Sequence, residues 1–161
     1  MLRNSLFAAV VVCMSGATAM ADGHAASGDA AAGETAFRQC IACHVVVNDD
    51  GETLAGRNGR QGPNLYAVAG RTIGSVEDFR YSPGLTALNE ADEIWVEENF
   101  VAYVQHPTNY IRTATGDNSL RGAMSFRVRS EEDALNLYAY LASLAPDSEE
   151  SMEDEDSETT Q

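Results

Sequence analysis

The sequence of 161 residues contains no lysine: its ten basic residues are all arginines, against 25 acidic residues and a formal net charge of −15. This balance excludes nucleic acid and anionic membrane surfaces as main partners, because like charges repel. The acid excess is concentrated at one end, where residues 147–161 contain eight acidic residues and no basic one. Such a segment cannot bury enough apolar surface to fold, so we interpret it as a disordered acidic tail.

The sequence also lacks a clear membrane-spanning run. The apolar stretch "LFAAVVVCM" at residues 6–14 follows Arg3 and precedes the small-residue pattern Ala19-Met20-Ala21. It is too short to cross a bilayer and is typical of a secretory signal peptide. We therefore expect a signal peptide over 1–21, cleaved after Ala21, one folded domain over 22–146 and the acidic tail over 147–161, with no membrane insertion.

Cysteine is scarce. Once Cys13 leaves with the predicted signal peptide, only Cys40 and Cys43 remain. A disulfide between them would close too short a loop to stabilise much chain. A structural zinc site needs four ligands and commonly a second cysteine pair, and a redox dithiol expects a preceding strand. In Cys40-Ile41-Ala42-Cys43-His44, however, two thiols can bond to the vinyl groups of a haem while His44 reaches the iron. We interpret the motif as the attachment site of one covalent haem c.

Convincing strand patterns are absent, and the periodicity predicts helices over residues 27–40, 91–107 and 130–146. Asp29 and Ser130 are the expected N-caps, and Pro107 is expected to end the second helix. Residues 64–70 favour one helical turn, "SPGL" a turn and residues 108–129 irregular structure, while "NDDGE" is compatible with a hairpin within a long glycine-rich loop. The predicted class is all-α, with three to five short helices and long loops. So few helices lack a core of their own, which a haem would supply.

A sixth ligand for the haem iron has few candidates. Four of the five methionines fall in the predicted signal peptide or the acidic tail, which leaves Met124 in the domain. It lies in the irregular stretch "RGAMSF" and not on a helix face, where a core-filling methionine is expected. We predict Met124 as the second axial ligand. His106 and an open sixth position remain the alternatives, and either would fit a haem enzyme or ligand sensor.

With the CIACH motif and this downstream methionine, the chain from Gly28 to about Ala145 resembles the class I c-type cytochromes, and among them the cytochrome c2 type of alpha-proteobacterial periplasms. The matching segments are "GDAAAGETAFRQCIACH", "GPNLYAVAGR", "FRYSP", "YVQHP" and "EDALNLYAYLASL". The resemblance implies a soluble, monomeric electron carrier of the periplasm, and not an enzyme. It would shuttle electrons between a membrane cytochrome bc complex and a terminal acceptor, which would be a photosynthetic reaction centre, an oxidase or a nitrite reductase.

The resemblance also implies roles for individual residues. His44 and Met124 would ligate the iron, and the Pro63 carbonyl would accept the ring proton of His44. The side chains expected to hydrogen-bond the haem propionates are Arg71, Tyr81 and Trp95. Tyr103 would lie near Met124. Leu137 and Tyr140 of the last helix would pack on Gly33 and Phe37.

Two departures from the family pattern concern the surroundings of Met124. The family usually carries a ring of lysines at the haem edge, and this chain has none. We hypothesise that arginines replace it: Arg57, Arg60, Arg112, Arg121, Arg127 and Arg129. The residue two before Met124, often a hydroxyl residue in the family, is Gly122, and we hypothesise that one propionate contact is either missing or supplied by Ser119.

Overall fold

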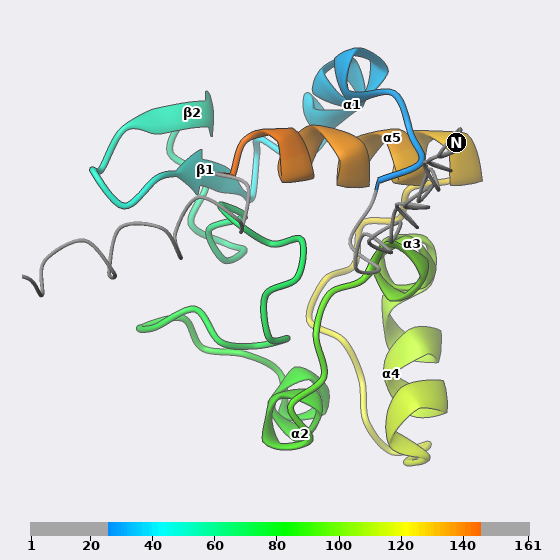
Figure 1. Ribbon diagram of the computed structural model, residues 1–161. Coiled ribbons are helices and arrows are strands. Elements are labelled where there is room, and N and C mark those ends of the chain that lie inside the picture. Colours follow the sequence, from blue (N-terminus) through cyan, green and yellow to red (C-terminus); the bar gives the residue numbers. More distant parts are fainter. Residues whose placement is uncertain (1–25, 146–161) are drawn as a thin grey trace, which may run out of the picture.

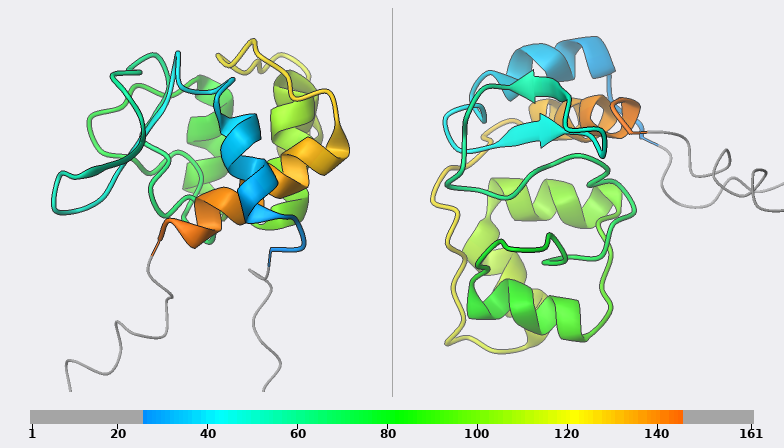
Figure 2. Two further views of the ribbon diagram at one scale, coloured as in Figure 1. Left: turned by 90° about the horizontal axis from the view of Figure 1, so that it is seen from above. Right: turned by 90° about the vertical axis from the view of Figure 1, so that its left-hand side faces the viewer.

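The computed structural model describes residues 26–145 (Figure 1). The predicted signal peptide and acidic tail lie outside the described residues. Seven elements follow one another along the chain: α1 Ala30–Phe37, β1 Val45–Val47, β2 Thr53–Gly56, α2 Pro83–Glu90, α3 Glu97–Gln105, α4 Pro107–Thr115 and α5 Glu131–Ser143. Figures 1 and 2 show α1 and α5 crossing at one end of the molecule and α2 at the other. The mostly helical class is confirmed.

The crossing of α1 and α5 depends on a glycine. The Asp29 carboxylate caps α1 by accepting hydrogen bonds from the backbone amides of its first turn. At Gly33 a Cβ atom would lie 2.6 Å from both the Asn136 carbonyl carbon and the Tyr140 Cβ atom, so only glycine lets the helices approach this closely. The Phe37 and Tyr140 rings pack beside it with their centroids 5.7 Å apart. The predicted contact between the first and last helices is thus confirmed.

The strands β1 and β2 form a small antiparallel hairpin, with Val45 opposite Gly56 and an irregularity after Val46. Its turn is the "NDDGE" segment, where the Asn48 amide donates to the Glu52 carbonyl over 3.0 Å. The hairpin considered at "NDDGE" is thus confirmed, but strands of three and four residues are too short for an alternating pattern to stand out, so the strands themselves were not predicted.

Two helices, α2 and α4, correct the sequence prediction of a turn at "SPGL" and irregular structure after Pro107. Both begin with a proline, at a position where the helix does not need its missing N–H group. Pro107 does end α3, as predicted, but it also begins α4, which ends at Gly116 with φ 72°. The predicted helical turn at 64–70 is also wrong, because Ala67 has a φ of 51° and the segment forms successive non-helical turns.

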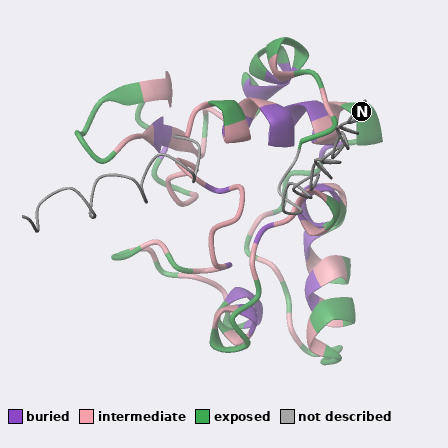
Figure 3. Cartoon of the chain, in the orientation of Figure 1, coloured by how far each residue is buried: buried purple, intermediate pink, exposed green. Residues whose placement is uncertain are grey.

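The buried side chains come from every helix and from the loops between them, as Figure 3 shows for α1, α2, α3 and α5. They surround a cavity instead of filling the centre of the molecule. Within residues 26–145, no helix is long and apolar enough to cross a membrane.

Candidate functional site

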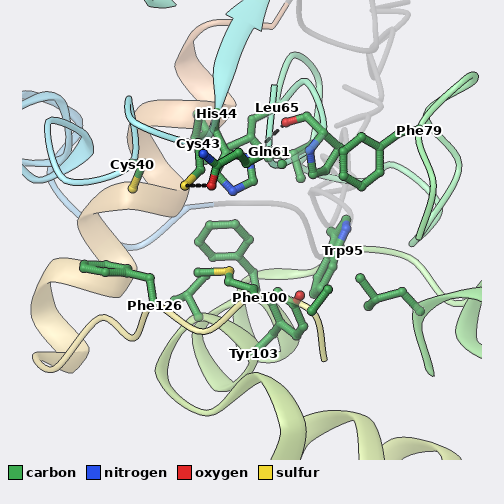
Figure 4. Close-up of a pocket in the computed structure, with 18 of the residues that line it drawn as sticks. Cys40, Cys43, His44, Gln61, Leu65, Phe79, Trp95, Phe100, Tyr103 and Phe126 are labelled. Carbon is green, nitrogen blue, oxygen red and sulfur yellow. Dashed lines mark hydrogen bonds between the residues drawn. The ribbon is translucent and has the colours of Figure 1, made fainter. Parts of the chain in front are cut away.

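One cavity of about 340 Å³ brings together segments that are far apart in the sequence (Figure 4). Its walls come from the ends of α1 and α2, the faces of α3 and α5, and the loops at 39–44, 61–82 and 123–128. All eight site residues predicted from the sequence line it: Cys40, Cys43, His44, Arg71, Tyr81, Trp95, Tyr103 and Met124. Their joint location in one cavity is compatible with the roles assigned to them.

A tight turn places the cysteines and the histidine side by side. The amides of Cys43 and His44 both donate to the Cys40 carbonyl, over 3.0 and 2.9 Å. Both cysteines are free thiols, and Cys43 lies close to His44 in Figure 4. Burial, and then the neighbouring Cys43, raises the pKa of Cys40 to about 11, so its thiol is neutral at pH 7.

The backbone behind the motif fixes the orientation of the His44 ring. Its Nδ1 atom lies 2.9 Å from the Pro63 carbonyl, which assigns the ring proton to Nδ1 and leaves the Nε2 lone pair free for a metal. Burial lowers the pKa of His44, opposed by this hydrogen bond, so the neutral ring is favoured. A Cβ atom at Gly62 would lie 2.5 Å from both ring nitrogens. Gly62 therefore leaves the space that the ring occupies.

A second part of the wall carries polar side chains that still have unused hydrogen-bond donors. The Arg71 guanidinium donates to the carbonyls of Tyr66 and Asn64, over 2.5 and 3.0 Å, but its buried Nε atom has no partner among the described residues. Burial lowers the pKa of Arg71, and the nearby Tyr81 partly offsets this. The Tyr81 hydroxyl accepts a hydrogen bond from Val76 over 3.3 Å, which leaves its own proton available.

Sequence reasoning missed Ser82 as a member of this group. Its Oγ atom is buried, lines the cavity wall and has no hydrogen-bond partner among the described residues. Ser82 holds the N-cap position of α2, yet its side chain makes no capping bond. A serine before a proline is an ordinary turn residue, so the sequence carried no signal for this role.

The opposite wall holds Met124 in a segment without helix or strand. Three hydrogen bonds attach residues 118–129 to α3 and α4: Val128 to Val104 over 3.0 Å, Arg112 to Leu120 over 3.1 Å and Gly122 to Thr108 over 3.2 Å. In Figure 4, Phe126 and Tyr103 lie across the cavity from Cys43 and His44. Trp95 packs against Tyr103 with ring centroids 5.1 Å apart.

Three sequence-based hypotheses, for His106, Ser119 and a zinc site, find no support in the structure. His106 is exposed between α3 and α4 and does not line it. The hypothesis for Ser119 is wrong: its exposed hydroxyl donates to the Asp117 carboxylate over 2.7 Å and it does not line the cavity. An aspartate two residues before a serine offers a local partner that a distant propionate cannot match. Within residues 26–145, no group of three or more His, Cys, Asp or Glu side chains could hold a zinc ion.

The donor set of the cavity fits a haem. A mostly apolar chamber would bury the macrocycle, two thiols and an imidazole lie on one turn, and a thioether lies on the other wall. The buried Arg71 nitrogen and Ser82 hydroxyl without partners suit two propionate carboxylates, because each is a donor that lacks an acceptor, which a carboxylate provides. Fold and site together define a class I c-type cytochrome.

Comparison with known proteins specifies the family. No family model matches the chain. Cytochrome c2 of Rhodovulum adriaticum is 61% identical over 118 residues, which are 73% of this chain and 94% of that protein. Cytochrome c2 of Cereibacter sphaeroides is 48% identical over 119 residues, 73% and 96% of the two chains. The chain belongs to the cytochrome c2 family, and this membership implies a haem c electron carrier.

Solved structures agree with this assignment. The crystal structure of cytochrome c2 from Rhodobacter sphaeroides has a TM-score of 0.71 and 47% identity, and covers 73% of this chain and 96% of that one. Ferric cytochrome c-550 from Paracoccus versutus has a TM-score of 0.70 and 38% identity, and covers 74% and 100%. The similarity therefore extends over the whole described domain.

Proposed function

We propose that the protein is a monomeric, periplasmic one-electron carrier with a single haem c, attached through thioethers to Cys40 and Cys43 and ligated by His44 and Met124. It moves electrons between a membrane cytochrome bc complex and a terminal acceptor, which is a photosynthetic reaction centre, an oxidase or a nitrite reductase. The observation that carries the proposal is the single cavity that joins the Cys40–His44 turn to Met124.

Each residue contributes a specific property. The haem, when bound, supplies the one-electron redox chemistry. The Pro63 carbonyl keeps the His44 proton on Nδ1, so that Nε2 remains a ligand. The Met124 sulfur, a soft and weakly donating ligand, favours the reduced state and raises the potential.

The propionate end of the cavity needs hydrogen-bond donors and shielding from water. Arg71, Tyr81 and Ser82 offer the donors, and Trp95 adds an indole N–H in the same wall. Trp95 and Phe100 are 7% and 6% exposed, so this region excludes water and preserves the electrostatic strength of the contacts.

A haem enzyme or ligand sensor with an open or histidine-ligated sixth position is the alternative. Peroxidase-type chemistry needs a distal group that moves protons. Among the described lining residues there is no aspartate or glutamate, and His44 is the one histidine. This composition favours electron transfer, because a carrier needs no acid–base group at the sixth position.

Axial ligation is tested with Met124→Ala in the haem-loaded protein. We expect loss of the weak long-wavelength band that methionine ligation gives ferric haem, rapid carbon monoxide binding by the ferrous protein and a lower midpoint potential. Met152→Ala, in the acidic tail, is the matched control and should change none of the three. An unchanged spectrum in Met124→Ala would exclude Met124 as the ligand and favour the alternative.

Covalent attachment and the partners need two further measurements. Acid–acetone extraction should leave the haem on the native chain and release it from the Cys40→Ser/Cys43→Ser variant. Membranes containing a cytochrome bc complex should reduce the purified carrier in an inhibitor-sensitive manner, and a second membrane complex should reoxidise it. Reduction that is insensitive to inhibition of the bc complex would contradict the assigned donor.

A further inference from the structure

The rim of the cavity differs in charge from the rest of the surface. Among residues 26–145, sixteen are acidic and nine are arginines. Five exposed arginines, here called the rim arginines, either line the cavity or directly adjoin a lining residue in the sequence: Arg38, Arg60, Arg80, Arg127 and Arg129. By the same criterion Asp78, next to Phe79, is the one acidic residue at the rim within the described part of the chain. The other fifteen acidic residues of this part of the chain neither line the cavity nor adjoin a lining residue.

Local structure explains why the rim presents its charge to solvent. Val128 is 6% exposed, and its amide donates to the Val104 carbonyl over 3.0 Å. Its neighbours Arg127 and Arg129 consequently face outward, and both are exposed. Phe126, which lines the cavity (Figure 4), is 41% exposed. The rim thus combines an apolar edge with positive charge, a surface that suits an acidic chain segment.

The sequence contains such a segment after α5. Residues 147–161 have eight acidic side chains and no basic one. They follow α5, whose Leu137 and Leu141 line the cavity, and the described chain ends at Ala145, about one helical turn beyond Leu141. Sixteen residues can span about 50 Å when extended, whereas a domain of this size has a radius of gyration of about 14 Å. The whole rim is within reach.

We propose that residues 147–161 bind in cis to the rim arginines. Because the segment is attached to the domain, its effective concentration at the rim is on the order of millimolar. The remaining acidic surface repels it, which directs it to the arginines. The segment then competes with the redox partner and lowers that partner's apparent affinity in proportion to the covered fraction. The competition rests on the proposed function, whereas the binding rests on charge and chain connectivity alone.

Binding is tested by comparing amide chemical shifts of the ferrous, haem-loaded full chain with those of a chain ending at Pro146. At low ionic strength we expect differences near the rim, at residues 38–39, 60–61, 80 and 126–129. They should vanish at about 500 mM salt, where the Debye length is only a few ångströms. Shifts absent at the rim would overturn the proposal. Shifts that grow with protein concentration would also overturn it, since they would place the segment of a second copy on the rim.

Competition is tested by oxidation of the ferrous protein with ferricyanide, in which one electron passes from the haem iron and no bond or proton moves. Removing 147–161 should accelerate the reaction in the native chain, both by reducing long-range repulsion and by uncovering the rim. Two double variants with equal net charge separate these effects. Arg60→Gln/Arg127→Gln removes rim charge, and Arg57→Gln/Arg121→Gln removes exposed charge outside the rim.

In the native chain and in the Arg57/Arg121 control we expect truncation to accelerate oxidation about fivefold, and in the Arg60/Arg127 variant only about twofold, because in that variant little rim binding remains to be lost. An equal acceleration in all three backgrounds would show that long-range repulsion is the whole effect and would overturn the proposal. Failure of every variant to exchange electrons would reject the proposed function, and the chemical-shift comparison would still decide whether the segment binds.

Discussion

The two walls that face each other across the cavity are built in opposite ways. The His44 wall, residues 40–44 and 59–65, is a tight turn supported by backbone: Gly62 donates to the Cys43 carbonyl over 2.9 Å, and Leu65 to the Val45 carbonyl over 2.9 Å. The Met124 wall, residues 118–129, is an irregular segment attached to α3 and α4 by three hydrogen bonds, two of which involve side chains. One side of the site is therefore rigid and the other is easier to release.

This difference agrees with the proposed function. A covalent attachment point would need a fixed geometry, because two thioether bonds and the proximal ligand would have to form together. The Met124 side would need only to supply one weak ligand and to form part of the mouth of the cavity. We therefore expect substitutions in the two walls to differ in size and in kind.

Gly62→Ala and Gly122→Ala should give the largest contrast. Neither glycine has a positive φ, so backbone strain does not complicate the comparison. A Cβ atom at position 62 would lie 2.5 Å from both ring nitrogens of His44, whereas at position 122 its nearest neighbour would be the Pro107 Cβ atom at 3.3 Å. We expect Gly62→Ala to lower the free energy of unfolding by about 2–3 kcal/mol, and Gly122→Ala by less than about 1 kcal/mol.

Guanidinium denaturation of the two haem-loaded variants, followed by circular dichroism, measures both values. Gly62→Ala should also disturb the spectrum of the ligated haem, because the imidazole has to move. Equal losses of stability in the two variants would mean that the walls do not differ in rigidity.

Alkaline pH should act mainly on the Met124 wall, because Tyr103 of α3 ionises next to the residue to which that wall is attached. Burial, and then the nearby Tyr81, raises the pKa of Tyr103 to about 12. In the unfolded chain this tyrosine ionises near pH 10, so the unfolded state loses its proton first as the pH rises. The stability from the neutral Tyr103 is thus complete below about pH 10 and is lost towards pH 12, on the order of 2 kcal/mol. Val104, the next residue, accepts the hydrogen bond from Val128 that attaches the Met124 wall.

Unfolding free energies at several pH values between 9 and 12 test this dependence. Tyr103→Phe should flatten the decline. Tyr140→Phe, at the crossing of α1 and α5, should flatten it less, because Tyr140 is more exposed than Tyr103, which is 8% exposed. A decline unaffected by Tyr103→Phe would assign the alkaline sensitivity to another group.

The same contrast explains which parts of the site were predictable. The His44 wall is mostly local, since the cysteines and the histidine fall within five consecutive residues and a tight turn brings them together. Met124 could be reached only by elimination among five methionines, because nothing near it in the sequence specifies the cavity. Ser82 could not be found at all. Its distinguishing property is an unpaired hydroxyl in a buried wall, which depends on long-range packing.

The errors in the fold have equally local causes. Pro83 and Pro107 suggested turns or helix ends, although proline is also favourable in the first turn of a helix, and both of these prolines begin one. The strands of the hairpin are too short to show periodicity. Local signals therefore predicted the long helices and the haem motif, but not the elements whose ends depend on packing.

Arg112→Gln should loosen the Met124 wall without unfolding the domain. The Arg112 Nε atom donates to the Leu120 carbonyl over 3.1 Å and so ties the segment to α4. A partly buried hydrogen bond from a charged donor contributes about 1–1.5 kcal/mol, so amide exchange over residues 120–126 should accelerate roughly tenfold. Arg121→Gln, at an exposed arginine, is the matched control. Equal acceleration at Cys40–His44 would indicate global destabilisation and contradict a separately held wall.

The smallest expected effect, from Ser82→Ala and Ser119→Ala, decides which serine faces the cofactor. The Ser82 hydroxyl is buried and has no partner among the described residues, so in the haem-loaded protein it is available to a propionate. Its removal should cost about 0.5–1 kcal/mol and change the pH dependence of the midpoint potential, since a propionate would lose a donor.

Ser119→Ala removes only an exposed hydrogen bond to Asp117 and should leave the potential unchanged. Ser82→Thr retains the hydroxyl and should restore the native pH dependence, which a purely structural role for Ser82 would not require. If Ser119→Ala moved the potential and Ser82→Ala did not, the propionates would contact the Met124 wall and not the N-terminus of α2. The Met124 wall would then be held by the cofactor itself, and the contrast between a rigid and a loosely attached wall would apply only to the chain without haem.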